Sequence, residues 1–370
     1  MGDSGQRHLG YDYMLLIPTL LLLALGLVAI YSASSSLAAH ELGDSHYYLK
    51  RQGLFCLLGL CFMIFAKNVP STLYRKLVYP FLLINLVLLI LLFVPGVGIR
   101  IGGASRWMRL AGLSFQPSEL AKLSLALYVA YSMAKKGPDM ALFSKGLLPH
   151  LFVTGAFITL ILLQPDLGTS IIVGCWLLIL LFVGGVNLFH LFSLVLLSAP
   201  VVLWLVWQAD YRLKRWWAFI NPWEDPQGLG FQIIHSFLAF GSGGIFGVGL
   251  GNSKQKLFYL PEPHTDFILS IVAEELGLVG LATIIMLFCI LVMRGMKIAL
   301  DAGDLYSSYL ALGISSLIGL QVLVNMGVVM GLLPTKGLTL PLISYGGSSL
   351  VVNLLGIGIL LSISARRYAT

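Results

Sequence analysis

Three carboxylates lie close together in one apolar stretch of the sequence, at Asp266, Glu274 and Glu275. Asp266 ends a polar approach and a long apolar run follows at once, so this side chain is predicted at the mouth of a membrane-spanning helix. The two glutamates are then expected roughly 12–13 Å deeper, at about 1.5 Å of rise per residue. Charged groups are costly in lipid, so each carboxylate needs a partner, a water-filled cavity or a chemical task. A simpler alternative is that Thr265 or Asp266 caps the N-terminus of this helix.

A second candidate pair lies one helical turn apart, at Glu119 and Lys122. Pro117 fits the first position of a helix, so Glu119 is also placed to close back on the helix cap. Capping does not explain Lys122, which is expected on the same helix face and further into the membrane. An ion pair within a membrane is costly to keep, which makes this pair a functional-site hypothesis.

Other candidates lie in connections between apolar runs. Asp166 belongs to a tight turn that contains Pro and Gly, where an aspartate is also an ordinary turn residue. Arg212 and Arg215 follow a long apolar run, and anchoring of that run at the membrane interface is an alternative to ligand binding. The residues alone therefore do not decide between a structural and a binding role at these positions.

The composition excludes several classes of protein. The chain of 370 residues is 58% hydrophobic and only 11% charged, far too apolar for a soluble globular protein. Its net charge of +7 does not indicate nucleic-acid binding, because the basic residues are scattered among connections. The cysteines all lie inside apolar runs and are interpreted as core residues, without a disulfide framework or a metal site: Cys56, Cys61, Cys175 and Cys289.

The apolar runs have the length of membrane spans. They predict an all-α integral membrane protein of one polytopic domain, residues 1–370, with ten transmembrane helices and a large extracytoplasmic loop at about 208–265. The N-terminus lacks a small-residue cleavage site, so the first run is expected to stay as an anchor. The expected spans are 12–33, 51–68, 75–95, 117–134, 147–164, 168–186, 188–207, 266–294, 306–330 and 344–364.

Basic residues indicate the orientation of these spans. Short segments rich in Lys and Arg alternate to one face, which the positive-inside rule makes cytoplasmic, with both termini on that side. The opposite face still carries about half of the Lys and Arg, including Arg100, Arg106 and Arg109 in one short connection. Such outward cations suit an anionic ligand such as a phosphate or a pyrophosphate.

Two irregular segments are expected on the outer face. The long loop at about 208–265 is rich in Trp and contains a glycine-rich run at 241–251, which suggests a loop that lies on or dips into the membrane interface. The glycine run follows no strand, so a dinucleotide site is rejected. The segment 333–349, with Lys336 and Ser344, is predicted to be packed, non-helical backbone at membrane depth.

Six motifs, in order and with compatible spacing, resemble the SEDS family of ten-span proteins of bacterial shape, elongation, division and sporulation. Thr335-Lys336 is similar to the division branch of that family more than to the elongation branch. Pro263 and Leu269 depart from the commoner family residues, and no departure touches a charged motif position. The motifs are Arg106-Trp107, Gln-Pro-Ser-Glu-Leu-Ala-Lys at 116–122, Gln-Pro-Asp-Leu-Gly-Thr-Ser at 164–170, Tyr-Leu-Pro-Glu-Pro-His-Thr-Asp-Phe-Ile at 259–268, Ala-Glu-Glu-Leu-Gly at 273–277 and Ile-Ser-Tyr-Gly-Gly-Ser-Ser at 343–349.

The resemblance implies a peptidoglycan glycosyltransferase that polymerises lipid II on the outer face of the bacterial cytoplasmic membrane. Asp266 matches the essential aspartate of the family, and we expect it to act as general base. Glu119 would orient Lys122, Asp166 would help order the acceptor, and the cations would hold the pyrophosphate. The expected substrate-binding residues are Arg106, Glu119, Lys122, Asp166, Arg212, Arg215, His264, Lys336 and Ser344.

The resemblance also implies partners, namely a cognate class B penicillin-binding transpeptidase and other divisome membrane proteins at the division septum. No cofactor is identified; a divalent cation, Mg²⁺ or Mn²⁺, at the pyrophosphate is an open option, without a dedicated metal site in the sequence. Three alternatives remain open at this point. The chain could flip lipid II through a pathway of ionisable residues such as Lys122, Glu274 and Glu275, it could be an elongation-type polymerase, or it could only recruit a transpeptidase.

Overall fold

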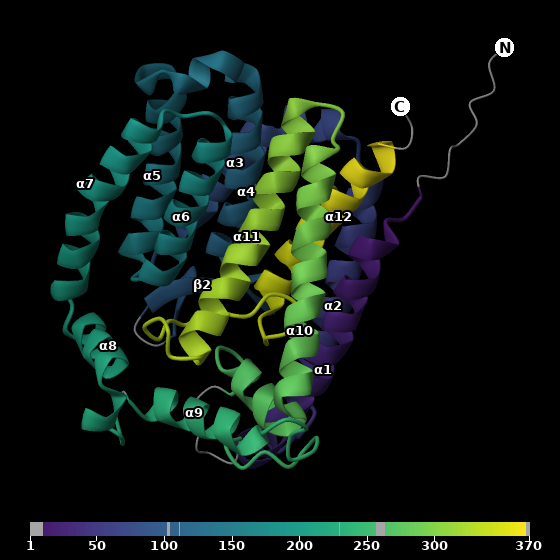
Figure 1. Ribbon diagram of the computed structural model, residues 1–370, viewed down its shortest axis with the longest axis vertical. Helices are drawn as coiled ribbons and strands as arrows, with labels where there is room; N and C mark the ends of the chain where they lie inside the picture. The colour runs from purple at the N-terminus through teal and green to yellow at the C-terminus, as the bar shows by residue number, and fades with distance from the viewer. Residues whose placement is uncertain (1–9, 102–103, 111, 229, 257–262, 368–370) are drawn as a thin grey trace.

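The computed structural model describes residues 10–101, 104–110, 112–228, 230–256 and 263–367. Within these residues, each expected span corresponds to a helix of one bundle (Figure 1). Eight of the described helices are long and apolar enough to cross a membrane, which confirms an all-α membrane fold. The bundle helices are α1 (Tyr13–Leu42), α2 (Tyr47–Asn68), α3 (Ser71–Leu91), α4 (Pro117–Lys136), α5 (Leu148–Leu163), α6 (Leu167–Val183), α7 (Leu188–Trp207), α10 (Ile268–Leu300), α11 (Leu305–Val329) and α12 (Gly347–Arg367).

Two bundle helices would not be recognised as spans by apolar length alone. Helix α6 has only 17 residues, and α4 contains Glu119 and Lys122 near its start. The count of ten spans therefore stays a prediction. The first bundle helix begins and the last one ends at the same end of the molecule, as an even number of spans requires (Figure 1).

Smaller elements lie outside the bundle helices, and the sequence did not indicate most of them. The connection predicted to hold Arg106 forms a three-stranded antiparallel sheet with β2 in the middle: β1 (Gly98–Ile101), β2 (Ala104–Leu110) and β3 (Leu113–Phe115). The long outer loop contains α8 (Asp210–Ile220) and α9 (Phe231–Gly243). Short turns of 3-10 or π helix occupy Gly137–Ala141, Phe143–Leu147 and Pro222–Glu224.

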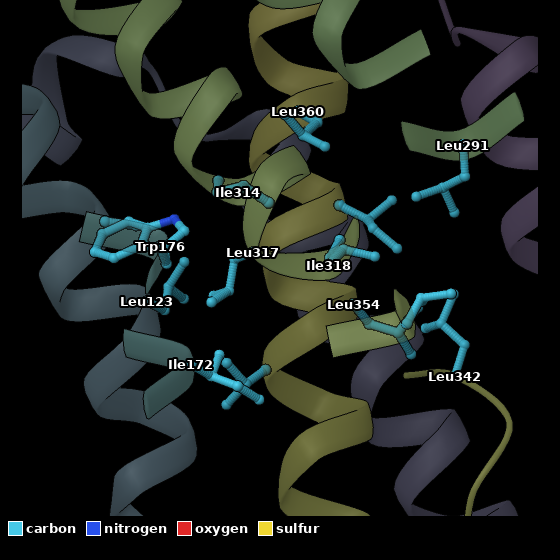
Figure 2. Packing of buried hydrophobic residues seen from close by; sticks show 14 of the residues in the cluster. Leu123, Ile172, Trp176, Leu291, Ile314, Leu317, Ile318, Leu342, Leu354 and Leu360 are labelled. Carbon is cyan, nitrogen blue, oxygen red and sulfur yellow. The ribbon is translucent and has the colours of Figure 1, made fainter. Parts of the chain in front are cut away.

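The core lies between α4, α6, α10, α11 and α12, where large aliphatic side chains and Trp176 interlock (Figure 2). The indole of Trp176 is buried, and its Nε1 donates to the Gly313 carbonyl of α11 at 2.8 Å, so its polar atom is satisfied. Helix α12 packs so closely on α2 that a side chain at Gly358 would clash with the Met63 carbonyl. Small residues at such contacts let membrane helices approach each other.

A buried ion pair joins three helices at the end where the chain starts. The Asp12 carboxylate, directly before α1, accepts from Nε of Arg294 in α10 at 2.9 Å and from Oγ of Ser364 in α12 at 2.6 Å. Asp12 is buried, so the pair is held away from water. Breaking a buried pair leaves an uncompensated charge, which makes this contact a stability determinant.

Helix α10 is broken at Gly277, which has a φ of 64° and a ψ of −161°. The glycine-rich run docks on this break: the amides of Val248 and Gly249 donate to the carbonyls of Glu274 and Glu275, both at 3.0 Å. In return, the amides of Leu278 and Val279 donate to Gly244 and Ile245, at 3.0 and 3.1 Å. The glycine run thus replaces the helical hydrogen bonds that the break removes, at the lower end of the molecule beside α9 (Figure 1).

We expect Gly277→Ala to destabilise the protein by roughly 3 kcal/mol, from left-handed backbone strain together with overpacking. A Cβ at this position would lie 2.5 Å from the Ile245 carbonyl oxygen. The thermal unfolding midpoint of the purified protein in detergent measures the effect. Gly174→Ala in α6 is the matched control, because its Cβ would meet nothing within 4 Å. Equal midpoints for the two variants would contradict the packing described for the break.

Candidate active site

Asp266 lies in the turn that precedes α10, half-buried, with its carboxylate beside Gly337 of the loop between α11 and α12. A Cβ on Gly337 would lie 3.3 Å from Oδ2 of Asp266. Asn325 of α11 joins the two segments, because its Nδ2 donates to the Asp266 carbonyl at 3.1 Å and to the Leu338 carbonyl at 2.6 Å. The backbone on either side of the carboxylate is therefore fixed.

Helix α10 begins at Ile268, and its N-cap residue is Phe267. Thr265 and Asp266 lie just before the capping position, so capping by either of them stays a prediction.

A cavity opens next to Gly337 and encloses about 760 Å³, counting the space at its open mouth. It is formed where β2, the start of α6, the end of α7, the helix α8 and the α11–α12 loop meet. Asp266 is not among its described lining residues, and its carboxylate lies beside Gly337, which is. Its lining residues are Arg106, Pro165, Asp166, Leu167, Gly168, Ile171, Val202, Val206, Tyr211, Arg212, Arg215, Trp216, Pro334, Thr335, Lys336 and Gly337.

Arg106 is positioned by the middle strand of the sheet. Its Nε donates to the Gln164 carbonyl at 3.0 Å, and Nη2 donates to the Pro165 carbonyl. These bonds hold the guanidinium against the turn that carries Asp166, and no ion pair with a carboxylate is seen for it among the described residues. The positive charge is thus presented to the cavity.

Arg212 and Arg215 come from α8 and share one aromatic partner. Their guanidinium carbons lie 5.4 and 6.0 Å from the ring centroid of Tyr211. Arg212 also donates to the Leu205 carbonyl of α7 at 2.8 Å, which ties α8 to the helix before it. Cation–π contact orders the side chains and leaves their charge available.

Asp166 caps α6 and also faces the cavity. Its Oδ1 accepts from the Thr169 amide at 3.0 Å and its Oδ2 from the Thr169 hydroxyl at 2.9 Å, so the turn interpretation is correct for its side chain.

Across the cavity, burial lowers the pKa of the Lys336 ammonium group, and the Asp166 carboxylate partly opposes this. The Lys336 ammonium is therefore closer to losing its proton than an ordinary lysine.

The pair predicted at Glu119 and Lys122 exists, with Nζ 2.8 Å from Oε1. Their side chains are only 9% and 5% exposed, and among the residues that the structure describes neither lines the cavity. The structure therefore does not bring Lys122 together with the cavity cations, and a direct contact between Lys122 and a ligand stays a prediction.

His264 is buried between two aromatic rings, with centroid distances of 4.3 Å to Tyr48 and 5.5 Å to Tyr345. Burial lowers the pKa of its imidazole to about 4, so the ring is neutral near pH 7. Its carbonyl accepts from the Tyr345 amide at 2.9 Å. These contacts give His264 a packing role beside the site.

This pKa predicts a pH-dependent stability. Because the folded pKa lies below the unfolded value of about 6.5, the contribution of His264 is present above pH 6.5 and is lost as the pH falls toward 4, by roughly 3 kcal/mol in all. Thermal midpoints measured from pH 7.5 to 4.5 should fall less steeply for His264→Phe than for the wild type. Parallel curves would show that the pKa of His264 is the same in the folded and the unfolded protein.

Ser344 has contacts within the protein that account for it. Its Oγ accepts from the Leu340 amide at 2.9 Å, and its carbonyl accepts from Nε2 of Gln52 at 3.3 Å. It is buried, and within the described part of the chain it does not line the cavity. Substrate contact by Ser344 and His264 stays a prediction.

The expected depth of Glu274 and Glu275 in the membrane stays a prediction. The helix breaks just after them, and both carboxylates contact the loop between α9 and α10. Glu274 accepts from the Lys254 amide at 3.1 Å, and Glu275 accepts from Nζ of Lys256 at 2.9 Å. Their partners satisfy them, and they do not mark a polar path through the membrane.

Some residues of the site were missed from the sequence. Asn325 positions Asp266, and its only signal was a polar side chain inside an apolar span. Trp216 and Thr335 line the cavity; they are uncharged, so no charge pattern pointed to them. The sheet that carries Arg106 was missed because its strands are too short for a clear alternation.

The cavity does not fit a resident divalent cation. Its charged lining consists of four cations and one carboxylate, Asp166, which already caps a helix. In the described residues no group of three or more His, Cys, Asp or Glu side chains could hold a metal. A divalent ion would have to enter with the phosphates of a substrate.

A family model described as "Cell cycle protein" matches residues 13–369, which include every residue of the cavity and Asp266. The chain belongs to the FtsW/RodA/SpoVE family of cell cycle proteins. The resemblance to the SEDS family is thereby confirmed.

Curated members of the FtsW/RodA/SpoVE family match almost the whole chain. A Geobacter metallireducens protein named "Probable peptidoglycan glycosyltransferase FtsW" is 48% identical over 97% of this chain and 96% of its own length. Stage V sporulation protein E of Bacillus subtilis is 44% identical over 95% of this chain and 96% of its length.

Solved structures of the FtsW/RodA/SpoVE family share the fold. RodA of Thermus thermophilus aligns with a TM-score of 0.72 at 32% identity, covering 98% of this chain and 99% of its own. A chain from a structure described as "Structural coordination of polymerization and crosslinking by a peptidoglycan synthase complex" aligns with a TM-score of 0.80 at 34% identity, covering 98% and 99%.

Proposed function

We propose that this protein is a peptidoglycan glycosyltransferase that polymerises lipid II into glycan strands for septal cell-wall synthesis. The observation that carries the proposal is the Asp266 carboxylate beside Gly337, which lines a cavity walled by Arg106, Arg212, Arg215 and Lys336. A proton acceptor beside a cluster of cations suits attack of a sugar hydroxyl on a donor that has a pyrophosphate leaving group. Relatives with 45–48% identity named FtsW support the same activity.

In the reaction, Asp266 accepts the proton of the acceptor hydroxyl as its oxygen attacks the anomeric carbon of the donor sugar. The new C–O bond forms while the bond from that carbon to the pyrophosphate oxygen breaks, and undecaprenyl pyrophosphate leaves with the electron pair. One carboxylate suffices for this inverting transfer, because the leaving group is already activated and needs no acid. The cavity cations stabilise the charge that develops on the pyrophosphate.

The roles of single cavity residues follow from the elements that carry them. Arg106 is fixed by two backbone carbonyls, which suits it for orienting the pyrophosphate. Arg212 and Arg215 lie on α8, outside the bundle, and are suited to close over it. Asp166 lines the same cavity and is assigned to ordering the acceptor.

Placement and partners belong to the same proposal. We place the cavity on the outer face of the bacterial cytoplasmic membrane, with both termini in the cytoplasm and the protein at the division septum. The similarity to a chain of a complex for polymerization and crosslinking supports a cognate class B transpeptidase as partner. Other divisome membrane proteins would then set where the enzyme acts.

No specific observation favours a lipid II flippase. Among the described residues, Lys122 is closed in a pair with Glu119, while Glu274 and Glu275 are held by the outer loop. A scaffold that only recruits a transpeptidase would leave the cavity without a task.

The test uses the purified wild-type protein in lipid with labelled lipid II, alone and with its cognate transpeptidase, and products resolved by length on a gel. Long glycan strands establish the transferase. No polymer in the presence of the partner, together with transfer of labelled lipid II between leaflets of sealed vesicles, would replace it by the flippase.

A further inference from the structure

The part of α10 before its break is a short, rigid piece of helix with Asp266 at its start. Its residues from Ile268 to Glu275 are all buried, between 0% and 4% exposed. Along its side, Oγ of Ser270 lies 2.8 Å from Oγ of Ser236 in α9, which in turn donates to the Val329 carbonyl of α11. A helical piece held in this way moves as one body.

The far end of this piece is anchored by a buried ion pair. Oε1 of Glu275 accepts from Nζ of Lys256 at 2.9 Å, and both Glu275 oxygens lie 2.7 Å from Oγ of Ser32 in α1. The same Lys256 ammonium lies 3.2 Å from the Ser32 hydroxyl, which closes a triangle of contacts. The side chains of Lys256 and Glu275 are only 6% and 3% exposed, so water competes little for them.

Glu274 adds a second anchor of another kind. It accepts from the Ser253 hydroxyl and from the amides of Lys254 and Gln255, at 3.1 and 3.3 Å. Two of these bonds come from the loop backbone and one from a loop side chain, and together they fix the loop while the Lys256 ammonium reaches across to Glu275. The loop, α1 and α10 are thereby held together at one point.

We propose that Glu275, Lys256 and Ser32 are positioning residues for the general base Asp266, an inference that rests on the proposed glycosyltransferase function. None of the three lines the cavity at Asp266 within the described structure, so they act through the helical piece. Because Ser32 belongs to α1, the triangle sets the position of Asp266 relative to the first helix of the bundle.

The expected effect is on turnover more than on substrate affinity. A displacement of about 1 Å at a reacting group can lower a rate by about 10²-fold, while the cavity cations that bind the pyrophosphate stay in place. We therefore expect Glu275→Gln to lower kcat for lipid II polymerisation about 10²-fold and to leave KM within about twofold. A rise in KM at unchanged kcat would assign Glu275 to substrate binding and overturn the proposal.

Loss of stability is separated from loss of position by two further variants. Arg294→Met breaks the buried pair with Asp12 on the same helix, beyond the break, and should lower the thermal midpoint with kcat near the wild-type value. The double variant Lys256→Met/Glu275→Met removes both buried charges, which should restore much of the stability while kcat stays low. Wild-type kcat in the double variant would show that only an unpaired charge had mattered.

A crosslinking measurement reports the geometry without catalysis. Asp266→Cys and Gly337→Cys are combined in a chain whose native cysteines are replaced, since Oδ2 of Asp266 would lie 3.3 Å from a Cβ at Gly337. We expect the disulfide to form at least several-fold more slowly when Glu275→Gln is added, and at an unchanged rate when Arg294→Met is added. Equal rates with and without Glu275→Gln would overturn the positioning role, whether or not the wild type polymerises lipid II.

Discussion

Asp266→Asn is expected to lower kcat for lipid II polymerisation by about 10³-fold, because the amide keeps the shape of the carboxylate and cannot accept the proton of the acceptor hydroxyl. The Asn325 bond goes to the backbone carbonyl of Asp266 and does not depend on its side chain. The turn should therefore keep its position, and KM should change little.

Glycan strands resolved on a gel over a time course measure this effect, with thermal unfolding as the check on folding. Asp44→Asn is the matched control. Asp44 is an exposed carboxylate that pairs with Lys50 at 2.8 Å, and neither of these two residues lines the cavity. It should keep the wild-type rate within about twofold. Full activity of Asp266→Asn would remove Asp266 as the base.

Lys336→Met is expected to lower kcat about 10²-fold, the usual effect of removing one group that stabilises developing charge in a transition state. Lys336 lines the cavity from the same loop as Gly337, which contacts Asp266. The exposed Lys254 supplies the control variant, Lys254→Met, which should change the rate by less than about twofold. A rise in KM at unchanged kcat would show that Lys336 binds the ground state and the transition state equally.

The lowered pKa of Lys336 gives this prediction a pH signature. Burial favours the neutral amine, so the cation is lost at a lower pH than for an ordinary lysine. As the pH rises through this lowered pKa, kcat/KM should fall, because it reports the free enzyme. Lys336→Arg keeps its charge and should move the fall to higher pH. An identical alkaline limb in both proteins would exclude Lys336 as the group that titrates.

The helical bundle could be predicted from the sequence because the length of an apolar run is a strong and local signal. The break at Gly277 could not, since one glycine in an apolar run costs a helix only about 1 kcal/mol. What decides the break is the docking of the run around Val248 and Gly249, a contact between distant segments. The small sheet was missed for a similar reason, because pairing partners, more than strand propensity, define it.

The site was predictable where charge and motif coincided. Arg106, Asp166, Arg212, Arg215 and Lys336 come from four separate segments and meet in one cavity, which Gly337 beside Asp266 also lines. Charge alone did not separate these residues from those that serve packing. From the sequence, the two carboxylates of the Ala-Glu-Glu-Leu-Gly motif were candidates for a chemical role on the same grounds as Asp266. Their partners in the loop and in α1 could be identified only from the structure.

The contact of Asp12 with Arg294 and Ser364 has a consequence for how the protein is made. These partners follow Asp12 by 282 and 352 residues. At a synthesis rate of about 5–20 residues per second, Arg294 is therefore made roughly 15–60 s after Asp12. During that time the first helix is already inserted, and its carboxylate depends on water or lipid headgroups. Arg294 and Ser364 must both be synthesised before the contacts around Asp12 can form, so these contacts between α1, α10 and α12 close late in the assembly of the bundle.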